Sequence, residues 1–328
     1  MSRRNIYDAR MVTRARHRTE LVDGLTRTQA ERLAHIDFRL CFLGELRRLD
    51  VSDRFGTGPA GATRDIAMYR EIAPRNLVLD PSDKIYRPSD AFHPVFDHPP
   101  ERVLTALSQG FGEGFGAVAG PLVRCEFPLS LNVPAMTILA PVTRAIHRGR
   151  AVRLRYHSTS SGATQREIVP IALIDTGVRW HVRAYDRKSR EFRDFVFTRM
   201  SDVTLLESDV VAPEESAEHD VQWNRIILLE LVPHPDYPDP AIVRMDYDMP
   251  DGVLRVSVRA ANAGYMLRRW NVDCSPDHAL DGPSHTLWLR DPLALYGATN
   301  AMLAPGYRDP RQEPATASKD DGIRRRHR

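Results

Sequence analysis

The residues from Arg179 to Val203, RWHVRAYDRKSREFRDFVFTRMSDV, place arginines among aromatic residues in a pattern typical of two short strands. Guanidinium groups are planar, forked donors that match the geometry of phosphate oxygens. Aromatic rings offer faces on which nucleobases stack. Together they predict a binding surface for a nucleotide or a short single strand of nucleic acid. From the residue types alone, its members are Tyr156, His181, Arg183, Tyr185, Arg193 and Arg199, with Arg155 beside them.

Other interpretations of the same segment remain open. Arg193 and Arg199 lie about 20 Å apart along a straight strand, so they would mark two ends of a groove. His181 could be an ordinary surface histidine. The arginines could instead pair with acidic residues of the same sheet, and the candidates for that pairing are Glu167, Asp186, Glu191 and Asp194.

Motifs that would place catalytic groups are absent from the sequence. It contains no HExxH, GxSxG or P-loop motif. Cys41, Cys125 and Cys274 follow no metal-binding or redox spacing. We therefore predict no catalytic residue, no metal site and no cofactor. The competing hypotheses are a nucleic-acid-processing enzyme or effector that uses the basic sheet as a substrate platform, which would require a carboxylate cluster or metal site, and a structural DNA-bridging protein that senses nothing.

Charge is distributed unevenly along the 328 residues, although the net charge is only +3. Residues 1–18 carry +5, residues 141–208 carry +6 and residues 209–318 carry −8. Basic chain ends either contact nucleic acid or serve only to keep a protein in solution, and the sequence does not decide between these two roles. The 42% of hydrophobic residues indicates a globular protein of two or three domains. No apolar run approaches the roughly 20 residues of a membrane helix, so we expect a cytoplasmic protein without membrane contact.

The N-terminal third has the element order of a winged helix-turn-helix. Apolar residues at helical spacing indicate a first helix, which Thr26 or Thr28 could cap. Proline is favourable at the first position of a helix, so Pro59 should open another one. The predicted elements are a helix over 27–50, a short helix over 52–55, a helix from Pro59 to about Ala73, and wing strands over 77–79 and 84–87.

This order of elements predicts binding to double-stranded DNA. The second helix of such a pair enters the major groove, where its first residues reach base edges, and the wing lies over the adjacent backbone. The alternative is a three-helix structural domain that binds no DNA, and a net charge of only +1 over 27–90 leaves it open. The candidate DNA-binding residues are Thr57, Thr63, Arg64, Arg70, Lys84, Tyr86 and Arg87, whereas Ala62, Ile66 and Tyr69 have core-like spacing.

The rest of the chain divides into three parts. Glycines over 110–116 do not satisfy GxGxxG and indicate a linker. Short alternating strands from residue 151, with a pair of strands over 164–177 that bends at Pro170, predict a five-stranded barrel of the SH3-like kind. Residues 225–305 predict a small α+β unit in which Asp291 and Pro292 open the last helix.

The strand-rich segment resembles a WYL domain. The resemblance lies in VRLRYHS, REIVPIALID, RWHVRAYD and FRDFVFTRM, with Trp180, His181 and Val182 where the family has Trp-Tyr-Leu. It adds Ser158 and Arg166 to the candidate ligand-binding residues. Over roughly 27–305 the chain is similar to three-part regulators of the BrxR/CapW type. That resemblance implies a homodimeric repressor of an anti-phage defence operon, an inverted-repeat operator, and a nucleotide or single-stranded ligand sensed by the WYL domain.

The expected fold class is therefore multidomain α+β. The expected parts are a basic arm over 1–26, the winged helix-turn-helix over 27–95, linker helices over 96–140, the WYL-like barrel over 141–208, a WCX-like C-terminal extension over 209–307 that forms the dimer, and a disordered basic tail over 308–328.

Overall fold

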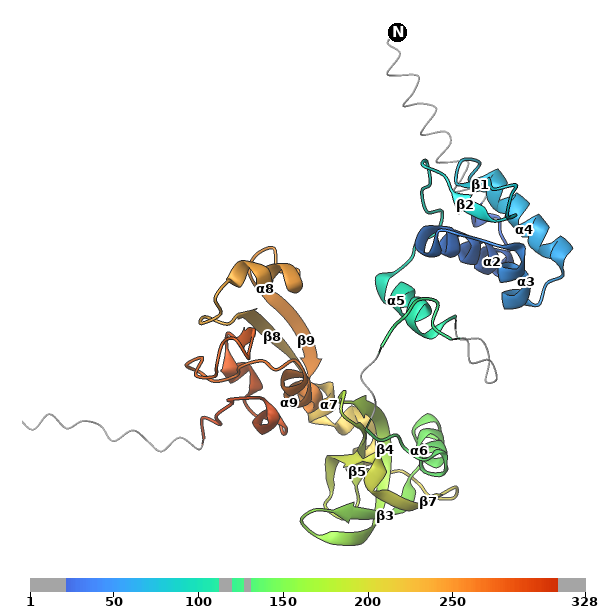
Figure 1. Cartoon of the computed structure of the whole chain (residues 1–328). Helices are drawn as coiled ribbons and strands as arrows, with labels where there is room; N and C mark the ends of the chain where they lie inside the picture. The colour runs from blue at the N-terminus through green and yellow to red at the C-terminus, as the bar shows by residue number, and fades with distance from the viewer. Residues whose placement is uncertain (1–21, 112–119, 127–130, 312–328) are drawn as a thin grey trace, which may run out of the picture. The chain divides into compact units, whose positions relative to one another are not determined.

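The computed structural model describes residues 22–111, 120–126 and 131–311, and it divides into two compact units, 1–127 and 128–328 (Figure 1). The glycine-rich linker lies largely outside the described residues, as do residues 1–21 of the expected basic arm and residues 312–328 of the expected tail. No helix in the described ranges is long and apolar enough to cross a membrane.

The N-terminal unit has the predicted helices and wing. The side chain of Thr26 caps α2 in a capping box with Gln29, and Pro59 opens α4 as expected. Ala62, Ile66 and Tyr69 are buried in its core, which confirms the predicted spacing. The elements are α2 (Arg27–Phe38), the π-helical turn η1 (Arg39–Leu43), α3 (Arg48–Phe55), α4 (Pro59–Ile72), β1 (Leu77–Leu79), β2 (Tyr86–Pro88) and α5 (Pro100–Gln109).

The prediction of one helix over 27–50 was wrong at its C-terminal end. Gly44 has a φ of 70°, the left-handed conformation that ends helices. Leu46 is extended and exchanges two backbone hydrogen bonds of 2.9 Å with Tyr86 of the wing. Its side chain is buried, so tertiary packing and not helical periodicity accounts for it. As a result α3 begins at Arg48, and not at residue 52 as expected.

The second unit begins with an antiparallel sheet in the order β6-β5-β4-β3-β7. Its strands are β3 (Val152–Ser158), β4 (Gly162–Asp175), β5 (Trp180–Asp186), β6 (Glu191–Val196) and β7 (Met200–Leu205). The number of strands agrees with prediction, but β4 is one strand where a pair was expected over 164–177, and β7 begins only at Met200, the end of the last predicted strand. The strand pairs of the described residues leave the sheet open, so the SH3-like barrel is not confirmed. The two edge strands, β6 and β7, do not pair with one another in the described residues, although the 3-10 turn η2 (Phe197–Arg199) connects them directly.

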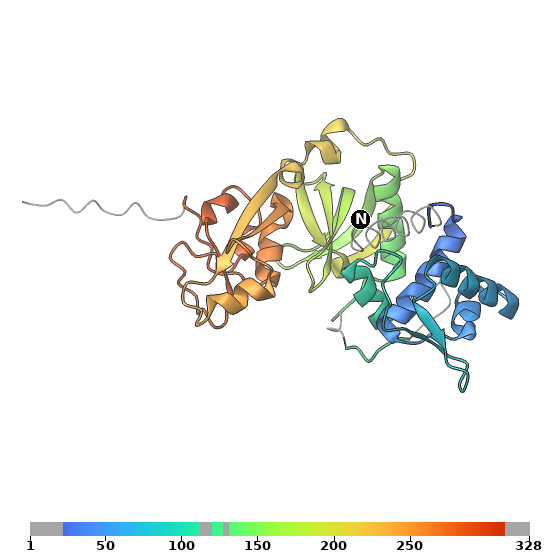
Figure 2. The same ribbon diagram turned by 90° about the horizontal axis from the view of Figure 1, so that it is seen from above.

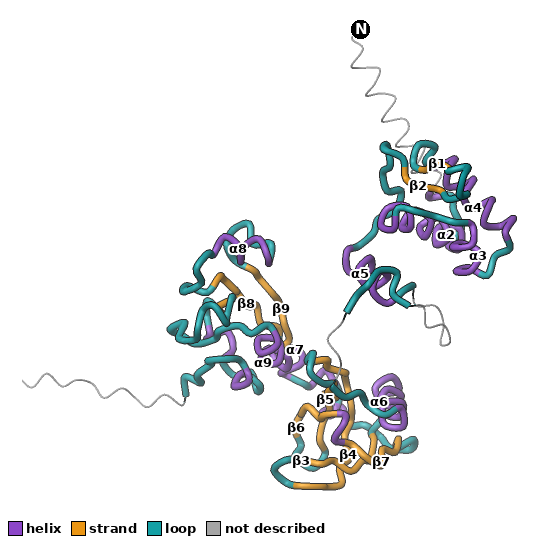
Figure 3. The backbone as a smooth tube through the Cα atoms, in the orientation of Figure 1, coloured by secondary structure: helices purple, strands orange, loops and turns teal. Residues whose placement is uncertain are grey.

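Helix α6 (Met136–Arg148) belongs to this sheet. Val142 and Ala145 are buried in the same apolar cluster as Leu154 and Phe195 of the strands. We had expected the linker helices to end at residue 140. The amphipathic face of α6 instead makes it a covering layer of the sheet (Figures 1 and 3).

The C-terminal part is a three-stranded antiparallel sheet, in the order β10-β8-β9, with helices around it (Figure 2). Its core contains Leu229, Leu231 and Leu267. Asp291 caps the last predicted helix, which is a 3-10 turn. The elements are η3 (Pro213–Glu215), η4 (Ala217–His219), α7 (Val221–Asn224), β8 (Ile226–Pro233), α8 (Pro240–Asp246), β9 (Leu254–Arg259), α9 (Ala260–Arg269), β10 (Leu287–Leu289), η5 (Pro292–Leu295) and η6 (Ala301–Leu303).

Candidate DNA-binding and ligand-binding surfaces

The first half of α4 presents two predicted DNA-binding residues to solvent. Thr63 and Arg64 are exposed, while Ala62 and Ile66 on the opposite side are buried. The Thr63 hydroxyl donates to the Pro59 carbonyl at 2.9 Å. Within the part of the chain that the structure describes, Arg64 has no hydrogen bond or ion pair, so its guanidinium is available to a base edge.

The other predicted DNA-binding residues lie around the wing and the turn before α4. Thr57 is half-buried in that turn. The Arg70 guanidinium lies 5.8 Å from the ring centroid of Tyr86, so the end of α4 contacts β2. Lys84 is exposed at a φ of 61°. Arg87 pairs with Asp80 at 2.9 Å and with Asp83, and its hydrogen bond holds the pKa of Asp83 below the usual range. Its charge is therefore largely neutralised inside the wing.

Arg183, which we expected on a ligand-binding face, is buried in an ion-pair network. It is 2% exposed. Its Nε and Nη2 donate to the two oxygens of Asp220 at 2.7 and 3.0 Å, and its Nη1 donates to Asp194 at 3.1 Å. The Tyr265 hydroxyl of α9 donates to the other oxygen of Asp194 at 3.0 Å, and burial raises the pKa of that phenol. The network therefore joins the five-stranded sheet to the C-terminal part.

Arg187 is also held by two acidic residues that follow the sheet in the sequence. It binds Asp209 and Glu215, each at 2.7 Å. Together with Asp220, these acids belong to the segment over 206–225 that follows the sheet. The positive charge of 141–208 is thus partly neutralised by the acidic segment that comes next, and not by an external ligand.

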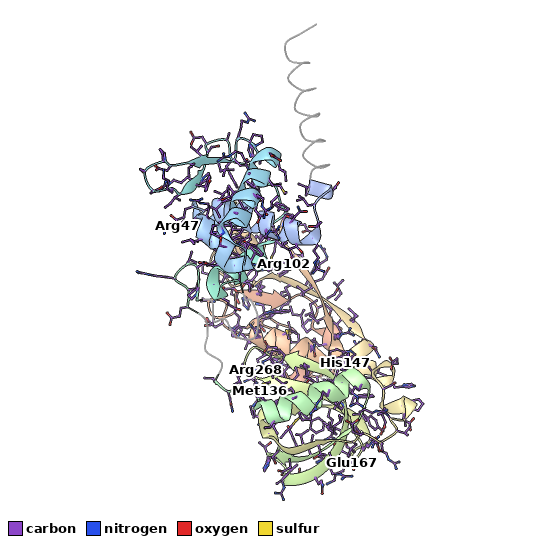
Figure 4. The ribbon with its side chains drawn as sticks, turned by 90° about the vertical axis from the view of Figure 1, so that its right-hand side faces the viewer. Arg47, Arg102, Met136, His147, Glu167 and Arg268 are labelled. Carbon is purple, nitrogen blue, oxygen red and sulfur yellow. The ribbon has the colours of Figure 1, made fainter. Side chains whose placement is uncertain are left out.

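The alternative partners within the sheet are also present. Arg166 pairs with the buried Asp186 at 2.8 Å, and Arg183 with Asp194. The remaining two pairs join exposed residues: Arg193 to Glu191 at 2.9 Å, and Arg153 to Glu167, which is labelled in Figure 4, at 2.8 Å. All four acids named as alternative partners therefore hold arginines, and a ligand phosphate would have to displace them.

His181 and Arg199 take part in no ion pair among the described residues. His181 is 4% exposed, and its ring lies 5.1 Å from that of Tyr265. Its Nδ1 has no hydrogen-bond partner among the described atoms. Burial lowers the pKa of His181; the charge of Asp194 and the backbone of Arg179 oppose that shift, and the nearby charges of Arg179 and Arg199 add to it. Arg199 is half-buried without a described hydrogen bond or ion pair.

The predicted aromatic and hydroxyl residues do not gather into one pocket. Tyr156 is a core residue: its Oη accepts from the Val196 amide at 3.2 Å, and its ring meets Phe195 edge-on. The Ser158 hydroxyl lies 3.1 Å from that of Ser160. Tyr185 is half-buried and packs edge-on against Phe192. No group of three or more metal-ligating side chains occurs in the described ranges.

Sequence reasoning missed Asp220 and Tyr265 as partners of the sheet. The signals that could have indicated them are weak. Asp220 stands before a short helix and accepts from the amides of Gln222 and Trp223, as an N-cap does. The change from +6 to −8 at residue 208 also pointed to intramolecular pairing.

Three family models match the chain. They are the BrxR transcriptional regulator winged helix-turn-helix domain over 28–109, the WYL domain over 137–205, and the BrxR transcriptional regulator C-terminal dimerization domain over 226–295. The match to the winged helix-turn-helix model includes α5, and the match to the WYL model includes α6 together with the sheet.

Three similar proteins carry the same name. The DNA-binding transcriptional repressor CapW of Escherichia coli (strain KTE188) is 31% identical over 261 residues, which cover 76% of this chain and 85% of that protein. CapW of Pseudomonas aeruginosa is 31% identical over 257 residues, covering 75% and 83%. CapW of Stenotrophomonas maltophilia is 31% identical over 254 residues, covering 75% and 84%.

Proposed function

The chain belongs to the BrxR/CapW family of WYL-domain DNA-binding transcriptional repressors, and from this premise we propose that it is a homodimeric repressor of an anti-phage defence operon. The observation that supports DNA reading best is the free guanidinium of Arg64 on the exposed first half of α4. A homodimer would present two such helices to the half-sites of an inverted repeat.

We further propose that the WYL sheet senses a nucleotide or a single-stranded nucleic acid. The supporting observations are the unpartnered Nδ1 of His181 and the half-buried Arg199 beside it. A cation near a buried hydrogen-bonding group suits a phosphate and a base edge. Such a ligand would change operator binding only if it bound the DNA-competent and incompetent states with different affinities.

The proposal is tested with the DNA upstream of the protein's own gene. We expect a labelled duplex from this region to shift as a single complex in a gel, and a reporter under the same region to be silenced by the protein. An unrelated duplex of equal length should bind about a thousandfold or more weakly, the lower end of specificity for such proteins. Equal binding of both duplexes would contradict a repressor and favour a DNA-bridging protein.

Arg199→Ala should remove the response to ligand while leaving operator affinity unchanged. Arg199 lies in η2 of the sheet, outside the winged helix, and it is not held by an acid among the described residues. The measurement is a gel shift with and without short single-stranded oligonucleotides. Arg153→Ala, which loses only an exposed pair with Glu167, is the matched control and should respond normally. Loss of operator binding by folded, dimeric Arg199→Ala would place the sheet in the DNA surface.

The outer face of β8 is the part of the C-terminal domain best suited to the dimer contact. Ile227, Leu229 and Leu231 point into the core, while Ile226 and Leu228 are 56% and 54% exposed. Leu228→Arg should therefore raise the dimer dissociation constant at least about tenfold, because an unpaired charge would be buried at the contact. Light scattering over a dilution series measures it. Met245→Arg on α8 is the control, and an equal effect of both variants would contradict a contact centred on β8.

A further inference from the structure

A surface hollow of about 330 Å³ lies between the start of α3 and the wing. It is lined by Arg47, Arg48, Leu49, Asp83, Lys84 and Ile85. Three of these side chains are cationic, and they come from two elements that are far apart in the sequence. Only Lys84 was among the residues predicted from the sequence to touch DNA.

The two sides of the hollow are fixed to one another. Leu46, two residues before α3, exchanges both backbone hydrogen bonds with Tyr86 of β2 at 2.9 Å. The side chains of Leu46 and Ile85 are buried beneath the hollow's rim. The arginines at the start of α3 and the lysine of the wing are therefore held at a set separation before any ligand arrives.

The acidic residues near the hollow do not neutralise its positive charge. Asp83 is the only acidic residue of the lining, and it is engaged by Arg87 and by the amide of Ile85. Glu45 lies 3.9 Å from Arg47, and because both side chains are exposed this pair is weak. Arg48 and Lys84 have no ion pair among the residues that the structure describes.

Lys84 occupies a backbone conformation that is unfavourable for a lysine. Its φ of 61° lies in the left-handed region, where glycine and asparagine are preferred. The turn is closed by hydrogen bonds from the Lys84 amide to Asp80 and from the Asp80 amide to Ile85. The turn thus holds an ammonium group at the edge of the hollow, although glycine or asparagine would fit this backbone conformation better.

We propose that this hollow binds a phosphodiester group of the DNA backbone and so sets the position from which α4 enters the major groove. The inference rests on the proposed DNA-binding function. In helix-turn-helix docking the helix before the recognition helix crosses the backbone, and here that helix is α3. Phosphate contacts of this kind fix position without reading sequence. The forked donors of Arg47 and Arg48 and the ammonium of Lys84 suit phosphate oxygens.

The test uses the full chain with Arg48→Ala and Lys84→Asn, singly and together. Asparagine removes the charge and tolerates the left-handed backbone, so folding should be preserved. The probes are the duplex from upstream of the gene and a random-sequence duplex, titrated by fluorescence anisotropy over a range of salt. Each substitution occurs twice in a dimer and should reduce the slope of log affinity against log salt by about 2. Both probes should lose affinity by the same factor, because phosphates carry no sequence.

The outcomes separate this inference from the proposed function. Arg102→Ala, on α5 outside the hollow, is the control and should keep the wild-type slope (Figure 4 labels Arg47 and Arg102). If the wild type binds neither probe, DNA binding itself is wrong. If the wild type binds and the folded double variant keeps its slope, the phosphate site is wrong while DNA binding stands. A loss confined to the upstream duplex would also overturn the site, because it would indicate a base contact.

Discussion

Replacing Arg183 by alanine is expected to lower the free energy of unfolding of the second unit, residues 128–328, by about 3–5 kcal/mol, which is the cost of leaving a buried charge without its partner. The arginine is almost fully buried and donates to both oxygens of Asp220 and to Asp194. Its loss leaves Asp220 buried with only its helix-capping bonds. Chemical denaturation followed by tryptophan fluorescence would measure the change.

The matched control is Arg193→Ala, which removes an exposed pair with Glu191 on the neighbouring strand. Exposed pairs contribute about 0–1 kcal/mol, so this variant should unfold almost like the wild type. The double variant Arg183→Met, Asp220→Asn should be more stable than the single variant Arg183→Met, because it removes both charges of the buried pair and leaves no unpaired carboxylate at residue 220. Equal stabilities of Arg183→Ala and Arg193→Ala would refute the network's role.

Arg64→Ala is the second large effect that we expect, this time on DNA binding. An arginine on the first half of a recognition helix can donate two hydrogen bonds to a guanine, and each such contact contributes roughly 1–3 kcal/mol of discrimination. Two subunits on an inverted repeat would each lose one contact. Operator affinity should therefore fall steeply, while binding to a random duplex, which depends on phosphates, should weaken only slightly. Competition binding with both duplexes measures the ratio.

Arg64→Lys keeps the charge but not the forked donor, so it separates the two contributions. We expect it to bind the random duplex like the wild type and to lose most of the preference for the operator. Full preference in Arg64→Lys, or an unchanged operator affinity in Arg64→Ala, would mean that other side chains of α4 read the bases.

Local signals predicted much of the fold. Thr26 and Pro59 act through their own backbone neighbours, so the starts of α2 and α4 followed from residue type. Period-two alternation likewise indicated the strand-rich part of the chain, although it suggested two strands where β4 is one. Leu46 was misassigned because its place depends on Tyr86, forty residues later, and no local pattern encodes that bridge.

The candidate ligand-binding residues were less predictable, for a related physical reason. Alternation correctly put His181 and Arg183 on the same face of β5, but it does not say what covers that face. The C-terminal part covers it with Asp220 and Tyr265. Arg183 therefore lies in a buried contact within the protein, although the alternation suggested an exposed phosphate-binding residue. Arg166 is likewise held by Asp186, and its substitution would disturb folding as well as any ligand.

The Arg183 network also has a consequence for engineering. Asp220 lies between the WYL match, which ends at 205, and the C-terminal match, which begins at 226. A chimera that exchanged WYL domains at these limits would separate Arg183 and Arg187 from the acids at 209, 215 and 220 that neutralise them. A transplanted WYL domain should therefore carry the segment up to residue 225, together with Tyr265 of α9, whose hydroxyl donates to Asp194. The segment between the two domain matches is thus not a passive linker but part of the contact that joins the domains.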